Sequence, residues 1–171
     1  MERLVSTSLT SAMTISPIVV LTAAAALGSA ASGGIFYVFS TFVMRGLDRT
    51  GPVDAITAMR GINAEANANA PFLLFLFGSA LLSLIVGALA VAQISRPGSW
   101  FLLAGAIFGV LGIVVTMLFN VPLNNHLDKV DLADAAAEWQ AYVSTWTAWN
   151  HVRTATGFLG AVLLLIGLRY R

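Results

Sequence analysis

Four long apolar segments constrain this chain more than any other feature of its sequence. They lie at about residues 16–44, 71–93, 100–119 and 147–168. A helix needs about 20 apolar residues to cross the hydrocarbon core of a bilayer, so each segment is long enough to span it. Only 10% of the 171 residues are charged, whereas soluble domains carry about 25%. The sequence therefore predicts an all-α integral membrane four-helix bundle, with residues 1–171 in a single membrane domain.

The first apolar segment has a second interpretation. Arg3, the apolar stretch 18–27 and the small residues 28–30 resemble a signal peptide that would be cleaved. The apolar run continues to residue 44 without a break, which favours a spanning helix instead. Within this helix, Ser29 and Gly33 form a small-residue patch that would let another helix approach closely.

The connections between the spans carry breakers and caps. Residues 53–69 have a helical pattern but are too polar to cross a membrane, and Pro71 is expected to kink this polar helix as it leads into the second span. Pro122 is expected to kink or stop the third span. The last helix is expected to begin near Asp134, which is an acceptable N-cap, and to run to Leu168.

Four spans place both termini on the same side of the membrane. The basic residues expected on that side are Arg3, Arg96, Arg169 and Arg171. Those expected on the other side are Arg45, Arg49, Arg60, Lys129 and Arg153. The second set is mixed with acidic residues, so the distribution favours a cell-membrane protein whose termini are cytoplasmic.

Aromatic and polar side chains share one face of the last helix. At 100° per residue, one stripe contains Trp139, Tyr142, Trp146, Trp149, Asn150 and Arg153. Counting back from Arg169 places Arg153 inside the membrane, where an arginine must be paired or hydrogen-bonded. His151 falls on a different face of the same helix.

Amide side chains at two other helix ends are expected at a similar depth. Asn63 and Asn67 share one face of the polar helix, while Glu65 points elsewhere. Asn120 and Asn124 lie one turn apart at the end of the third span. Together with the stripe, these amides predict a polar, aromatic-walled pocket between helices. The same residues could instead have purely structural roles. The tryptophans and tyrosine would then form an aromatic belt at the membrane interface, the asparagines would hydrogen-bond between helices, and Arg153 would extend to the lipid headgroups.

Few groups in the sequence support other chemistries. The absence of cysteine excludes disulfides, thiolate catalysis and iron–sulfur ligation. The two histidines, His126 and His151, do not form a pair of haem ligands, and nothing in their spacing to Glu65 or Glu138 selects a metal site. A net charge of +1 argues against nucleic-acid binding. No metal or organic cofactor is therefore predicted.

Motifs in both halves of the chain resemble a known family. The first half contains Gly33-Gly-Ile-Phe-Tyr-Val-Phe-Ser40 and Ala58-Met-Arg-Gly-Ile-Asn63. The second half contains Asn120-Val-Pro-Leu-Asn124 and Trp146-Thr-Ala-Trp149-Asn-His-Val-Arg153. Over residues 20–168 the chain resembles the anthrone oxygenase-like membrane proteins, most of which are otherwise known only as a domain of unknown function. The resemblance implies a small four-helix membrane protein. A few members of the family are assigned the oxygenation of anthrones to anthraquinones.

An anthrone has an acidic methylene opposite a carbonyl, and its anion reacts with molecular oxygen without a metal. A site for this reaction needs a base, donors for the oxyanion and apolar walls. Under the resemblance, the expected oxyanion donors are Arg153, Asn150, Asn63 and Asn120. The expected contributors to the binding of an aromatic substrate, by stacking or by polar contact, are Trp146, Trp149, Tyr142, Asn67 and Asn124. The base is open between His151, taken first, and Glu65.

Two non-enzymatic readings compete with the oxygenase. The chain is alternatively a membrane scaffold or accessory subunit, which would form a homo-oligomer through Ser29 and Gly33. It is alternatively a binder of a small amphipathic ligand. Transport ranks last because no inverted repeat is visible in the sequence. The expected partners are the lipid bilayer, an aromatic small molecule and a second copy of the chain.

Overall fold

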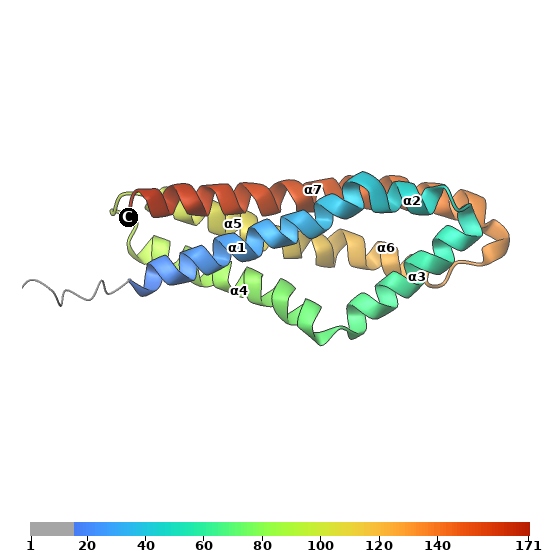
Figure 1. Ribbon diagram of the computed structural model, residues 1–171, viewed down its shortest axis with the longest axis horizontal. Helices are drawn as coiled ribbons and strands as arrows, with labels where there is room; N and C mark the ends of the chain where they lie inside the picture. Colours follow the sequence, from blue (N-terminus) through green and yellow to red (C-terminus); the bar gives the residue numbers. More distant parts are fainter. Residues whose placement is uncertain (1–15) are drawn as a thin grey trace, which may run out of the picture.

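The computed structural model describes residues 16–171, which are helical apart from short connections (Figure 1). Arg3 and the rest of residues 1–15 lie outside the described part. Four helical runs in residues 16–171 are long and apolar enough to cross a membrane: Pro17–Asp48, Ala70–Ala92, Ser99–Leu127 and Leu132–Arg169. The predicted all-α membrane bundle is therefore confirmed, and each expected apolar segment falls on one of these runs.

The helices have the following bounds. The first run contains α1 (Pro17–Val38), a π-helical turn (Phe39–Val43) and α2 (Met44–Asp48). Next come α3 (Pro52–Ala68) and α4 (Ala70–Ala92). The third run contains α5 (Ser99–Val115), a second π-helical turn (Thr116–Asn120) and α6 (Val121–Leu127). A short 3₁₀ turn (Leu132–Asp134) precedes α7 (Ala135–Arg169), which begins where the sequence predicts.

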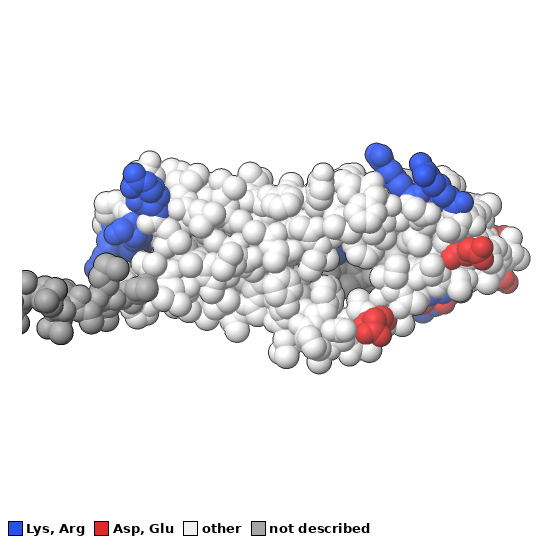
Figure 2. Space-filling view, viewed as in Figure 1, with Lys and Arg blue, Asp and Glu red and all other residues white. Residues whose placement is uncertain are grey.

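The bundle is longer than a membrane is thick. The 35 residues of α7 extend about 52 Å, against about 30 Å for the hydrocarbon core. Figure 1 shows α7 along the whole molecule, from the terminal end, where α1 begins and α7 ends, to the distal end, where α2 meets α3. Figure 2 shows basic groups at the terminal end, a middle whose surface is almost free of charged groups, and mixed charges at the distal end. The distal end therefore projects beyond the hydrocarbon when the terminal end lies at the membrane surface.

The direction of the chain changes between α3 and α4 at Asn69, where the helix is interrupted. Asn69 adopts an extended conformation (φ −83°, ψ 93°), and its side chain accepts a hydrogen bond from the backbone N–H of Phe72 at 3.0 Å. Pro71 lies in the first turn of α4, where its missing N–H is not needed. Instead of the expected kink at Pro71, the helix is interrupted at Asn69, two residues earlier. The Asn69 side chain caps the N-terminus of the new helix, α4.

Pro122 does not stop the third helical run, which was one of the two outcomes expected for it. The run continues to Leu127. The π-helical turn at residues 116–120 shifts the backbone hydrogen-bond register just before the proline. Pro122 then falls in the first turn of α6, a position that tolerates the absence of an N–H.

Glycines bring α7 close to α1 and α5 in the terminal half of the bundle. A Cβ atom on Gly157 would lie 2.6 Å from Cα of Gly33, and one on Gly160 would lie 3.1 Å from N of Gly109. The patch around Ser29 and Gly33 therefore does permit close helix approach, as expected, but the helix it contacts is α7 of the same chain. Ser29 is buried by this contact.

Substitution of Gly157 tests this packing. We expect Gly157→Ala to lower the free energy of unfolding by about 1–3 kcal/mol, because the methyl group would meet backbone atoms that cannot move aside. Gly61→Ala is the matched control, since a Cβ there has no neighbour within 4 Å and alanine favours the helix. Thermal unfolding in detergent measures both, and equal stability of Gly157→Ala and wild type would contradict the packing argument.

Candidate functional site

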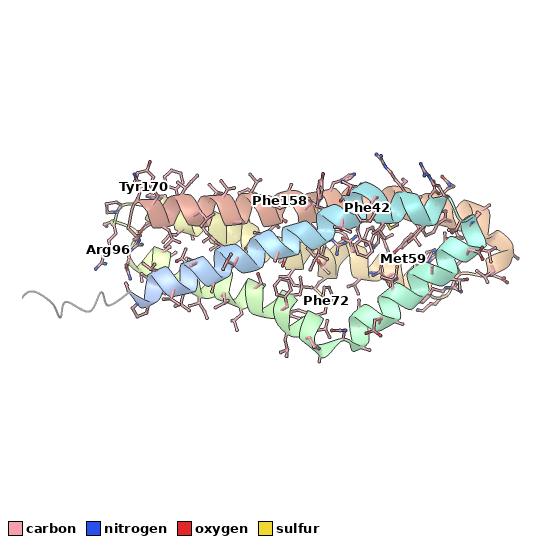
Figure 3. The ribbon with its side chains drawn as sticks, in the orientation of Figure 1. Phe42, Met59, Phe72, Arg96, Phe158 and Tyr170 are labelled. Atoms are coloured by element: carbon pink, nitrogen blue, oxygen red, sulfur yellow. The ribbon has the colours of Figure 1, made fainter. Side chains whose placement is uncertain are left out.

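A cavity of about 290 Å³ lies behind the break between α3 and α4 and is lined by residues of α1, α3, α4, α5, α6 and α7. Its walls are mostly apolar, and the aromatic members are Phe36, Phe39, Phe72, Phe77 and Trp146. Its polar members are Asn63, Asn67, Thr116, Asn124 and Arg153. Figure 3 labels Met59 on α3 and Phe72 on α4, which line the cavity from the two sides of the break. The volume is at the lower end of the range for small-molecule sites.

The cavity lies in the distal half of the bundle, close to the membrane surface on that side. Arg153 is about 24 Å along α7 from Arg169, which is less than the thickness of the hydrocarbon core. The 23 residues of α4 extend about 35 Å from the terminal end, so the break at Asn69 falls near the opposite membrane surface. Figure 2 shows a hollow on this face with basic atoms inside it, and Arg153 is the basic residue among the lining residues.

Arg153 is 5% exposed and has no carboxylate partner among the residues that line the cavity. Its Nη2 donates to Oδ1 of Asn150 at 2.6 Å, and its Nη1 donates to Oγ1 of Thr116 at 3.4 Å. The guanidinium carbon lies 4.2 Å from the ring centre of Phe36 and 5.0 Å from that of Trp146. Its Nε–H has no partner in the described residues. The aromatic faces offset part of the desolvation of this cation, which retains donors for an anionic ligand.

Asn150 fixes the position of Arg153 from outside the cavity. It is fully buried, and its Nδ2 donates to the carbonyl of Phe36 and to Oγ of Ser40, both at 2.7 Å. Both acceptors belong to the stretch of chain around the π-helical turn at residues 39–43. Because its oxygen accepts from Arg153, Asn150 links the α1 backbone to the guanidinium. Asn150, one of the expected oxyanion donors, is thus positioned to hold Arg153 in place.

The asparagines of α3 and of the third helical run have different surroundings. Oδ1 of Asn124, which lines the cavity, accepts from the hydroxyl of Tyr142 at 2.9 Å and from Nε1 of Trp146 at 2.8 Å. Asn120 is buried beside the cavity and donates to the carbonyl of Trp146 at 3.2 Å. Asn63 and Asn67 line the cavity, and Nδ2 of Asn63 is buried without a partner in the described residues.

Six of the expected site residues do not line the cavity: Asn120, Tyr142 and Asn150, whose contacts are given above, and Trp149, His151 and Glu65. Trp149 stacks on Phe119, with ring centres 3.6 Å apart and an interplanar angle of 9°. His151 is exposed in a separate groove on the other side of α7. Glu65 is exposed and accepts from Nδ2 of Asn69 at 3.1 Å. The structure therefore brings neither candidate base to the cavity.

Sequence reasoning missed the phenylalanine wall and the two π-helical turns. Phe36 and Phe39 are three residues apart in α1 and the adjoining turn, a spacing that puts both on one helix face and could have indicated the wall. The turns at residues 39–43 and 116–120 both lie beside the cavity, since Phe39 and Thr116 line it. Such turns often occur at functional sites, but they leave no simple signature in a single sequence.

Substitution of Asn150 tests the support of Arg153. We expect Asn150→Ala to lower the free energy of unfolding by about 1–3 kcal/mol, because it leaves buried donors and acceptors unpaired. Asn125→Ala is the control, since Asn125 is exposed. Thermal unfolding of the purified variants measures the difference. An Asn150→Ala protein as stable as the control would show that these hydrogen bonds do not hold the site together.

Comparison with known proteins identifies a family for this chain. A family model described as anthrone oxygenase matches residues 70–163, which is more than half of the chain and includes Asn124, Trp146 and Arg153. Comparisons with curated proteins and with solved structures give no match. The chain, a membrane bundle with an aromatic cavity around a buried arginine, belongs to the anthrone oxygenase family.

Proposed function

We propose that this protein is a cofactor-independent membrane oxygenase that converts an anthrone-like aromatic substrate to a quinone with molecular oxygen. The observation that carries the proposal is Arg153, a buried guanidinium with spare donors and no carboxylate among the lining residues of an aromatic cavity. Membership of the anthrone oxygenase family supports the reaction class.

The proposed reaction oxidises a ring methylene to a carbonyl. Loss of one methylene proton gives an anion whose charge is shared with the carbonyl oxygen across the ring. This anion transfers one electron to O₂, and the resulting radicals combine to form a carbon–oxygen bond and a peroxide. Loss of the second methylene proton with cleavage of the O–O bond gives the new carbonyl and water. One oxygen atom enters the product and the other leaves as water, so four electrons pass from substrate to O₂.

Arg153 would stabilise the anion that starts this sequence. Nη1 and Nη2 each use one hydrogen in bonds to Thr116 and Asn150, so their second N–H groups can donate to the enolate oxygen, and the buried surroundings strengthen that interaction because water does not screen it. The rings of Phe36 and Trp146 hold the guanidinium plane, so little reorganisation is needed when charge develops. The remaining aromatic walls can stack on a flat tricyclic substrate.

Water is the proton acceptor in this proposal. No histidine or carboxylate is among the residues that line the cavity, and His151 and Glu65 lie outside it. Asn67, which is exposed and lines the cavity, marks the side on which water can enter near the membrane boundary. Stabilisation of the enolate by Arg153 makes the methylene more acidic, which lets a weak base remove its proton.

The same cavity supports a second candidate function, the binding of an anionic amphipathic ligand without turnover. The observation that favours it is the missing side-chain base among the lining residues. This candidate requires saturable binding of the aromatic ligand without oxygen uptake or product.

Oxygen uptake by the purified protein in nanodiscs, with anthrone as substrate, tests the oxygenase. We expect uptake with quinone formation above the spontaneous rate, a loss of about 100-fold in Arg153→Ala and a smaller loss in Arg153→Lys, which keeps the charge. Arg45→Ala removes an exposed arginine outside the cavity and is the matched control.

Thermal unfolding of each variant separates loss of activity from loss of fold. Uptake no faster than the spontaneous rate, or full activity in a folded Arg153→Ala protein, would reject the oxygenase proposal. Loss of activity in a folded His151→Ala protein would identify His151 as the base in place of water.

We also propose that the protein lies in the cell membrane with cytoplasmic termini. Arg96, Arg169 and Arg171 lie at the terminal end without acidic neighbours, whereas the basic residues of the distal half, Arg45, Arg49, Arg60 and Lys129, are mixed with the acidic residues of the described chain. This distribution fits the preference of basic residues for the cytoplasmic side.

The absence of cysteine allows a direct test of this orientation by single-cysteine labelling. With a membrane-impermeant maleimide on intact cells, we expect Lys129→Cys to react and Ser95→Cys to react only after permeabilisation. Both positions are exposed and flank spanning helices at opposite ends of the bundle. The reverse pattern would show that the termini lie outside the cytoplasm.

A further inference from the structure

We infer that Asn124 determines specificity in the cavity, by presenting a donor of fixed orientation that selects ligands with a second acceptor oxygen. The inference deepens the proposed function and rests on its assignment of the cavity as the substrate site. It concerns which aromatic ligands bind, and it can therefore be tested without turnover.

Trp146 fixes the orientation of the Asn124 amide. The indole Nε1 can only donate a hydrogen bond, and it lies 2.8 Å from the amide oxygen of Asn124. A flipped amide would place an NH₂ group against this N–H, so that two donors would face each other without an acceptor. The flip would therefore cost the hydrogen bond and leave buried donors unpaired.

Tyr142 reinforces the same orientation. Its hydroxyl donates to the same oxygen of Asn124 at 2.9 Å. Tyr142 and Trp146 are 3% and 4% exposed and stack on one another, so both donors are held in place by packing. The amide oxygen is fully engaged on the α7 side. The Nδ2 group of Asn124 makes no hydrogen bond to the described residues and is left for the cavity.

Asn124 lies at the N–H edge of the Trp146 indole, and the guanidinium of Arg153 lies over the face of the same ring. The guanidinium carbon is 5.0 Å from the ring centre of Trp146, and the N–H of the same ring binds Asn124. Both side chains line the same cavity, so a fused aromatic ligand bound there can contact both groups. An ionised oxygen would then bind Arg153, and a neutral carbonyl or hydroxyl oxygen would accept from Asn124.

Anaerobic binding to the protein in nanodiscs tests the inference, because oxygenation cannot proceed without O₂. Quenching of tryptophan fluorescence gives the Kd of two probes, anthrone, which has one oxygen, and 1,8-dihydroxyanthrone, which has two more. We expect wild type to bind 1,8-dihydroxyanthrone about tenfold more tightly, in line with one additional hydrogen bond. The ratio of the two Kd values is the readout, since a general loss of fold would weaken both probes.

Asn124→Asp is the decisive variant. Its carboxylate can still accept from Tyr142 and Trp146, which preserves the packing, but an oxygen replaces the cavity donor. We expect the preference for 1,8-dihydroxyanthrone to disappear in this variant and to be reduced in Tyr142→Phe. Asn125→Asp adds the same charge at an exposed neighbouring position and should keep the preference.

An unchanged Kd ratio in Asn124→Asp, or no preference in wild type, would overturn the inference while leaving the oxygenase proposal intact. An Asn124-dependent preference in a protein that consumes no oxygen would support the inference and reject the oxygenase. Failure of wild type to bind either probe would overturn both, because the cavity would not be the substrate site.

Discussion

The close packing of α7 against α1 and α5 is the interaction on which the rest of the structure depends. In a bilayer, lipid chains are as apolar as the helices, so association relies on van der Waals contact and on polar groups rather than on the hydrophobic effect. Gly33, Gly157 and Gly160 provide this contact in the terminal half by removing the side chains between backbones. The distal half is built differently, with Trp139, Tyr142 and Trp146 buried along α7. Large side chains separate the helices there, and the cavity occupies part of the resulting space.

Arg153 lies where the small-residue half of α7 meets the aromatic half. Its charge would be expensive in hydrocarbon without compensation, and the described chain offers it amide and hydroxyl acceptors and two aromatic faces. These groups accept some of the guanidinium's hydrogen bonds. They do not neutralise its positive charge, because no carboxylate lines the cavity. A carboxylate partner would bind Arg153 more tightly and would also compete with any anionic ligand. The arrangement thus favours ligand binding at some cost in stability.

The sequence predicted the elements of the fold well because bilayer thickness restricts helix length and composition. It also predicted the burial of Arg153 and the alignment of Tyr142, Trp146 and Arg153 on one face of α7, since angle and depth along a helix follow from residue number alone. It did not predict which helix each face meets. Trp149 belongs to the predicted stripe but stacks on Phe119 outside the cavity.

Backbone irregularities account for the other differences between sequence and structure. Pro122 remains within a helical run because a π-helical turn precedes it, and the polar helix breaks at Asn69 because an asparagine cap is available there. Each outcome depends on hydrogen bonds between a few atoms rather than on a periodic pattern. The site depends on these irregularities, since the break opens the side of the bundle on which Phe72 and Asn67 line the cavity. Periodicity therefore predicted the helices and not the space between them.

The position of the cavity at the membrane boundary suits the proposed reaction. Ile35, Phe77 and Met117 line the cavity and are also 37%, 48% and 50% exposed on the lipid-facing part of the bundle, so the cavity can be reached from the bilayer. O₂ and a flat aromatic substrate are both apolar enough to enter from lipid, whereas a released proton must reach water. A site deeper in the membrane would lack a proton acceptor, and a site outside it would admit water to the reactive anion. Burial of Arg153 just below the boundary meets both requirements, because the side chain is only 5% exposed while exposed Asn67 marks the water-facing side of the same cavity.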